Sequence, residues 1–241
     1  MRISRILVTF IFALLFFSIV NAPANLLKPY LKNSISIPFT LNGSIWSGSI
    51  HSQYFNSVSW DIDPLYLLLA KVSIQLKADL DAQNILNAKA EISPFKKLEL
   101  RGINGVLTTQ YLQKFLPNMP FLFSSNIEIN QANASWSNSL PPNLPSESKG
   151  NFLIKEVNFL GENLGSYSFN FVYFNRSLEG DISSSKKSAL SAALKLTISP
   201  ERLLIITGEI FPKTRNLELL FKELNVDLKP RITYQLPLSN I

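Results

Sequence analysis

Few side chains in this sequence could carry out acid–base, nucleophilic or metal chemistry. His51 is the only histidine, and the chain contains no cysteine. A thiolate nucleophile, a disulfide framework and a His/Cys metal cluster are therefore excluded. A Ser-His-Asp relay would have to use His51. Because no glycine-bounded nucleophile lies near this residue in the sequence, we interpret His51 as a polar position in a strand.

Asp61 and Asp63 are the only other residues whose spacing could indicate a catalytic pair. They flank Ile62, so a strand would place both carboxylates on one face. Paired carboxylates can act as acid and base when burial separates their pKa values. The alternative, which we favour, is that both face solvent at the end of a strand before Pro64. The sequence contains no GxxxxGK[ST], GxGxxG, HExxH or GxSxG pattern. We therefore expect no catalytic residue, no metal site and no cofactor, and a protein that is not an enzyme.

The residues at 41–69 contain two tryptophans in strand-like surroundings. Trp46 stands in a short run bounded by glycines, and Trp60 stands where apolar and polar residues alternate. Each indole brings a large apolar area and one N–H group, so we expect both to anchor a sheet face. Pro64 ends the alternation and is followed by the apolar residues 65–69, which we expect to form a short helix.

Alternation with a period of two continues through most of the chain and predicts many strands. It is clearest at residues 72–81. Further strands are expected at 39–41, 85–92, 98–103, 151–159, 166–173, 178–182, 190–198, 203–211 and 232–236, and strand-like residues occur at 121–123, 127, 129 and 136. Two more short helices are expected, one capped by Thr108 and ending before Pro117, the other at 216–225.

A proline- and serine-rich run at 139–149 separates two possible halves, 38–138 and 150–241. Neither a helix nor a central strand accepts such a density of proline. The strand pattern is alike on both sides. The sequence therefore leaves open whether the run joins two domains or two parts of one sheet.

Tyr167, Phe169, Phe171 and Tyr173 alternate with polar residues and form an aromatic stripe on one face of a strand. Such a stripe could be a platform for a ligand. Aromatic residues at this spacing more commonly belong to a hydrophobic core, and we favour the core interpretation.

The N-terminal residues have the pattern of a membrane segment. No charged residue occurs at 6–27, and Arg2 and Arg5 precede this run. We expect a cytoplasmic tip at 1–5, a transmembrane signal anchor at 6–27 and a juxtamembrane linker at 28–37, with the β-rich body of 38–241 across the membrane. The alternative is a signal peptide cleaved after the small residues at 22–24.

The net charge of the chain is +6, and Arg2 and Arg5 account for two of these charges, which leaves about +4 on the body. Its lysines are scattered and alternate with acidic residues. A nucleic-acid-binding protein would concentrate positive charge on one element. We therefore expect no nucleic-acid partner. Taken together, the patterns predict a mainly β fold: one N-terminal transmembrane helix followed by a long, folded-over antiparallel sheet, groove-like or resembling an open barrel, with two or three short helices.

The pattern of glycine, tryptophan and proline in the first half of the body resembles that of a known family. The runs GSIWSG and VSWDIDPLYLLLAKVSIQL are similar to those of type II secretion system protein N, also called general secretory pathway protein N. The positions that match its motif form a structural signature: Gly43, Trp46, Gly48, Trp60, Pro64 and Leu68. The resemblance extends more loosely to the end of the body.

This resemblance implies a single-pass inner-membrane protein of a Gram-negative bacterium, with its body in the periplasm. It further implies a non-enzymatic accessory role in exporting folded proteins across the outer membrane, with other type II secretion components as partners. The long one-sided sheet is also similar in style to AsmA-like envelope proteins. That similarity supports an alternative function, a periplasmic lipid or lipopolysaccharide carrier with an apolar groove.

Overall fold

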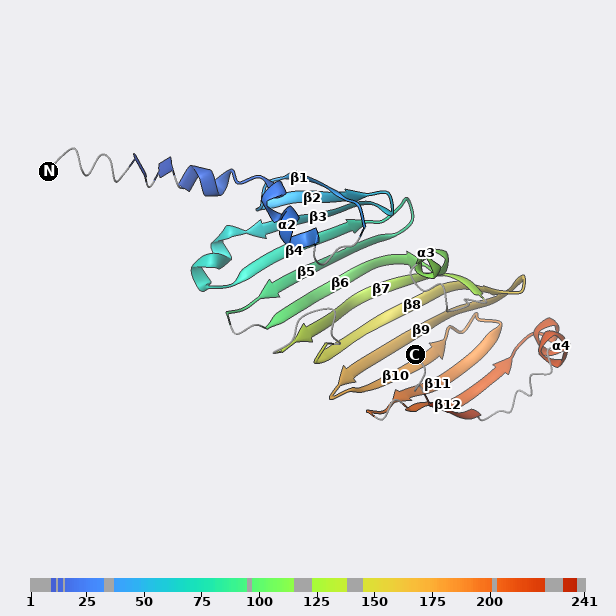
Figure 1. The fold of residues 1–241 in the computed structure, drawn as a ribbon. Helices are drawn as coiled ribbons and strands as arrows, with labels where there is room; N and C mark the ends of the chain where they lie inside the picture. Colours follow the sequence, from blue (N-terminus) through green and yellow to red (C-terminus); the bar gives the residue numbers. More distant parts are fainter. Residues whose placement is uncertain are drawn as a thin grey trace.

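The computed structural model describes residues 10–32 except 12 and 15, 37–94, 97–114, 123–137, 145–200 and 203–223, together with the backbone of 232–237; the side chain of Leu68 is not described. The described strands form one antiparallel sheet of 13 strands, in which the spatial order is the order along the chain (Figure 1). The mainly β prediction is therefore confirmed. The sheet is open, because β1 and β13 stand at its two edges.

The strands lengthen toward the middle of the sheet. Their bounds are β1 Thr40–Gly43, β2 Ser47–Ser52, β3 Phe55–Asp63, β4 Val72–Asp79, β5 Ile85–Ile92, β6 Leu98–Thr108, β7 Phe123–Trp136, β8 Glu147–Phe159, β9 Glu162–Phe174, β10 Ser177–Ser184, β11 Leu190–Ile198, β12 Leu203–Pro212 and β13 Ile232–Pro237. β7 and β8 pair with each other, so the strands on both sides of the 139–149 run lie in the same sheet.

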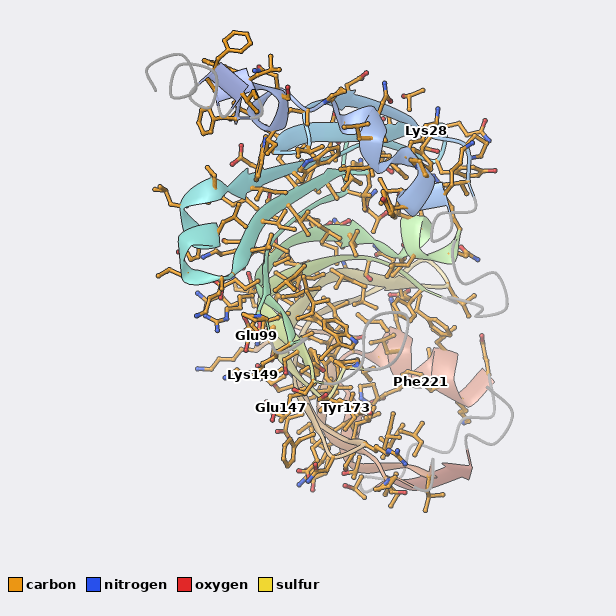
Figure 2. All side chains as sticks on the ribbon, turned by 60° about the vertical axis from the view of Figure 1, so that its left-hand side comes forward. Lys28, Glu99, Glu147, Lys149, Tyr173 and Phe221 are labelled. Carbon is orange, nitrogen blue, oxygen red and sulfur yellow. The ribbon has the colours of Figure 1, made fainter. Side chains whose placement is uncertain are left out.

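After the N-terminal helical residues 10–20, five short helices accompany the sheet in the described part of the chain. They are η1 Ala24–Leu27, α2 Lys28–Lys32, η2 Pro64–Leu69, α3 Thr109–Gln113 and α4 Arg215–Glu223, where η marks a 3-10 helix. The helices predicted after Pro64, after Thr108 and at 216–225 are confirmed as η2, α3 and α4. The predicted helical residues 115–116 lie outside the described residues. Figure 2 shows α2, α3 and α4 on one side of the view and η2 on the other.

One face of the sheet is apolar. Residues that pair directly on neighbouring strands lie on the same face, so a row of apolar pairs identifies it. The row of paired residues that crosses the sheet from β5 to β12 is Leu86, Gly105, Ile129, Phe152, Phe169, Ile182, Leu194 and Gly208. The opposite face carries Ser, Asn, Lys and Glu at most positions. We call these the apolar face and the polar face.

β-bulges keep long strands in phase with the apolar face. In β7 the apolar residues occupy odd-numbered positions up to Ile129 and even-numbered positions from Ala132 onward. The pairing register between β7 and β8 shifts between Asn130 and Asn133. Gln131 takes up the extra residue with φ 51°, and its N–H donates to the Asn104 side-chain oxygen at 2.8 Å. The bulge therefore allows one 14-residue strand to present apolar residues to a single face throughout.

The largest buried cluster lies where α4 packs on the apolar face. Leu217 of α4 is 1% exposed and packs with Val157, Leu164, Tyr167 and Ala192. This cluster covers one end of strands β8 to β12. Burial of these apolar side chains is the main stabilisation of the C-terminal part of the sheet.

The N-terminal segment differs from the prediction. Residues 10–20 are helical where they are described, and the chain then turns, with Pro23 forming an isolated bridge to Ser44. The helical conformation ends before Pro23, because proline cannot continue a helix and Pro23 pairs instead with the β1–β2 turn, and the signal anchor at 6–27 stays a prediction. The predicted linker at 28–37 contains α2. Residues 1–9 lie outside the described residues. Among the described residues, no helix is both long enough and apolar enough to cross a membrane.

Candidate functional site

Trp60 and Gly48 form the centre of the signature cluster. They are direct partners in β3 and β2. A Cβ atom at Gly48 would lie 2.5 Å from the Trp60 ring and 2.6 Å from the Asn42 carbonyl oxygen, so the indole can cover this backbone only where no side chain intervenes. The Trp60 Nε1–H donates to the Ile45 carbonyl oxygen at 3.1 Å. Trp60 therefore fastens β3 to the β1–β2 turn.

Trp46 lies in that turn and joins the sheet to the N-terminal segment. Its Nε1–H donates to the Ile19 carbonyl oxygen at 2.9 Å, and the neighbouring Ile45 N–H donates to the Ala22 carbonyl oxygen at 2.9 Å. Gly43 opens the turn with φ +91°, a conformation that favours glycine. Trp46 and Trp60 thus act at one place, where the N-terminal segment meets the first strands.

Pro64 begins η2, and the Asp63 carboxylate caps this helix by accepting from the Leu65 N–H at 2.9 Å. Leu68 lies in the same helix. Leu65 is 69% exposed and Leu69 is 68% exposed, with Leu67 also exposed. The sequence predicted the helix but gave no sign that its leucines face solvent. We call Leu65, Leu67 and Leu69 the leucine patch.

The residues considered for catalysis have structural contacts. The His51 ring nitrogens lie 2.9 Å from Ser49 Oγ and 2.8 Å from the Asn56 carbonyl oxygen, so the imidazole links β2 to β3. Asp61 and Asp63 share the polar face, and Asp63 is the η2 cap. No group of three or more possible metal ligands occurs among the residues that the structure describes.

An ion-pair network crosses the polar face of β5 and β6. Lys89 lies 2.9 Å from Glu91, Arg101 lies 3.7 Å from the same carboxylate, and Arg101 also pairs with Glu99. The hydrogen bond from Lys89 holds the pKa of Glu91 below its usual value. The pKa of Glu99 is also lowered, mainly by the hydrogen bond from Lys97 and next by the hydrogen bond from Arg101. These charges are satisfied by one another, so the network stabilises the strand surface rather than forming a reactive site.

A cavity of about 490 Å³ lies on the polar face beside this network, lined by residues that include Glu99, Lys149 and Phe174. Figure 2 shows Glu99, Glu147 and Lys149 gathered at this part of the sheet.

The aromatic stripe lies on the apolar face of β9. Tyr167 is in the buried cluster under α4, its hydroxyl lies 3.0 and 2.9 Å from the carbonyl oxygens of Leu164 and Leu190, and burial raises the pKa of Tyr167 to about 12. The core interpretation is confirmed for Tyr167. Phe169 and Phe171 stack at 5.8 Å, and both pack against Phe152. Tyr173 stands at the other end of the stripe and lines a second cavity.

A family model for type II secretion system (T2SS), protein N, matches residues 40–226 of the 241-residue chain. The chain belongs to this family. The family recognised from the signature residues is thereby confirmed. Neither the curated proteins nor the solved structures that were searched contain a match.

Membership of the protein N family implies a role in type II secretion, a location in the cell envelope and partners within the secretion system. It suggests a structural component rather than a catalyst. In this protein N, the matched range begins at β1 and covers the sheet through β12 and α4, so it includes every strand of the sheet except β13.

Proposed function

We propose that this protein N is a non-enzymatic accessory component of the inner membrane that supports export of folded proteins by contacting other secretion components in the periplasm. The N-terminal apolar segment would hold the chain at the membrane, as the sequence predicts. The sheet would present its surfaces to the partners.

The leucine patch is the observation that supports protein contacts. Three leucines in a six-residue helix are exposed to water, although each would gain free energy by burial. Contiguous exposed apolar side chains of this kind mark sites of association with other proteins. The helix η2, which carries the patch, lies at the end of the strands where the N-terminal segment joins the sheet (Figure 1), so a partner bound there would lie close to the membrane.

The double substitution Leu65→Ser and Leu69→Ser tests this proposal in cells that rely on the chain for secretion. We expect the amount of exoprotein in the medium to fall about tenfold, while the level of the variant in the envelope stays unchanged, because both side chains are exposed. Leu160→Ser is the matched control, since Leu160 is an exposed leucine in the turn at the opposite end of the strands. Normal secretion both by the double variant and by cells lacking the chain would refute the proposal.

A second candidate function is carriage of lipid or lipopolysaccharide in the periplasm. It is favoured by the apolar face, which extends across the sheet and which, among the described elements, α4 covers at one end only. Lipid chains would be an alternative means of removing this face from water. Native mass spectrometry of the detergent-extracted protein distinguishes the two functions, because a carrier retains lipid and a purely protein-binding component does not.

A further inference from the structure

A cavity of about 1010 Å³ opens at the end of the apolar face that lies away from α4. Its apolar lining includes Tyr173 of β9, Leu178 of β10 and Ile198 of β11. Its rim is formed by the turns that follow β9 and β11. This volume is at the upper end of the range for small-molecule binding sites.

Arg176 is the one charged residue among the described residues that line this cavity. It is exposed, and no described carboxylate lies within ion-pair distance of it. Among the described residues, the lining therefore combines apolar walls with one positive charge at the rim that has no described carboxylate partner. An anionic group attached to an apolar chain matches both features.

The backbone at this rim also favours a role for the Arg176 side chain. Asn175 and Arg176 form the two-residue turn between β9 and β10, with φ of 51° and 63°. Turns of this type favour glycine at the second position, because a side chain with positive φ is strained. Arg176 therefore places a charge at the cavity although its positive φ strains the backbone of the turn.

From Tyr173 at the cavity, the aromatic stripe continues along the same face of β9 toward α4. Phe171 and Phe169 follow Tyr173 on the same face, and Tyr167 closes the row under Leu217. The six residue-to-residue steps from Tyr167 to Tyr173 span about 20 Å along the strand. A bilayer leaflet has about 15 Å of hydrocarbon, half of the full core. One extended acyl chain therefore fits this length.

We infer that this cavity binds an anionic acyl lipid, with its negatively charged head group at Arg176 and its acyl chain on Tyr173, Leu178 and the stripe beyond them. The inference names a ligand class and a site for the second candidate function and rests on it. The turns at the cavity rim lie at the same end of the strands as the β1–β2 turn, where the N-terminal segment joins the sheet (Figure 1). A lipid would therefore enter from the membrane side. In Figure 2, Tyr173 is labelled at the lower part of the sheet, and Phe221 marks α4.

Native mass spectrometry of the full chain tests the inference in detergent micelles that contain palmitate, phosphatidylglycerol or phosphatidylcholine. We expect one anionic lipid per chain and about tenfold weaker retention by Arg176→Glu, because the reversed charge repels the head group. Lys187→Glu is the matched control, since Lys187 is an exposed residue in the turn at the opposite strand ends. It should retain lipid as the wild type does.

Three further arms identify the lipid and exclude unfolding. Retention of palmitate alone assigns a free fatty acid, and retention of phosphatidylglycerol over phosphatidylcholine assigns an anionic phospholipid. Arg176→Gly should weaken retention without lowering thermal stability, because glycine suits the turn. Arg176→Lys should retain lipid, because the positive charge remains.

Equal retention of lipid by Arg176→Glu and wild type, or no retention by wild type, would overturn the inference. A secretion assay on the same variants separates this result from the fate of the main proposal. If secretion depends on the chain but the chain retains no lipid, only the lipid site is refuted. If lipid is retained at Arg176 but secretion does not require the chain, only the secretion role is refuted.

Discussion

Among single residues, Trp60 makes the contacts that the signature pattern alone could not describe. Its ring lies over Gly48 on the neighbouring strand, and its N–H reaches the turn that holds Trp46. The two tryptophans therefore stabilise one junction, although 14 positions separate them in the sequence. The spacing of the signature residues follows from this packing.

Trp60→Ala should lower the free energy of unfolding by about 2 kcal/mol, because it removes a half-buried indole and the hydrogen bond to Ile45. Chemical denaturation of the purified chain measures the change. Tyr54→Ala is the control, since Tyr54 is an exposed aromatic residue in the next turn, and it should change stability by less than about 0.5 kcal/mol. Equal losses in the two variants would mean that Trp60 has no specific packing role.

Glu91 and Glu99 should make stability depend on pH. Their pKa values are lowered below the ordinary 4.5, chiefly by hydrogen bonds from Lys89 and Lys97 respectively. A carboxyl group that binds its proton more weakly in the folded state stabilises the fold above pH 4.5, and this contribution is lost as pH falls through the lowered values.

Glu99→Gln tests this dependence. At pH 7 the variant should be less stable than the wild type by about 0.5–1 kcal/mol, because the pairs are largely at the surface. The difference should shrink as pH falls below 4.5 and through the lowered pKa of Glu99, because the wild-type carboxylate then becomes protonated in the folded state as well. Glu156→Gln, at an exposed glutamate outside the network, should follow the wild-type curve. A Glu99→Gln deficit that is independent of pH would contradict the electrostatic explanation.

At the scale of the elements, the period of two predicted most strands, with β5 and β11 at the observed bounds. It failed to show that β7 is continuous, because the bulge at Gln131 changes the phase of the apolar residues. The signature residues were found from their types. The leucine patch and the Arg176 cavity were not found from the sequence, since exposure and turn geometry arise from the packing of distant strands rather than from local spacing.

The helix α4 provides a test of how much one element stabilises the sheet. Leu217→Ala should cost about 3 kcal/mol, because Leu217 is 1% exposed at the centre of the buried cluster. Leu219→Ala on the same helix is the matched control, since Leu219 is 51% exposed, and it should cost less than about 1 kcal/mol. Thermal unfolding of both variants provides the comparison. Similar costs at the two positions would mean that α4 does not pack as described.

The whole molecule is open rather than compact. The chain exposes 16624 Å², whereas a compact protein of 27.1 kDa exposes about 11,000 Å². Each strand pairs with its neighbours in sequence, and the described helices add contacts mainly at the strand ends. Stability should therefore be distributed along the sheet as in a repeat protein, in which each unit depends on its nearest neighbours.

Hydrogen exchange measures this distribution directly. Protection should be greatest in the 13- and 14-residue strands β7, β8 and β9 and should decline toward β1 and β13, because the outer strands are shorter and each edge strand has one partner. Leu217→Ala extends the test, because removing a contact of α4 should lower protection in β9 to β12 and leave β2 to β5 unchanged. A uniform loss across the sheet would show a single cooperative unit, and the neighbour-by-neighbour description would then be wrong. Retained protection in β2 to β5 would instead mean that the Trp46–Trp60 junction and the α4 cluster stabilise the two ends of the sheet independently.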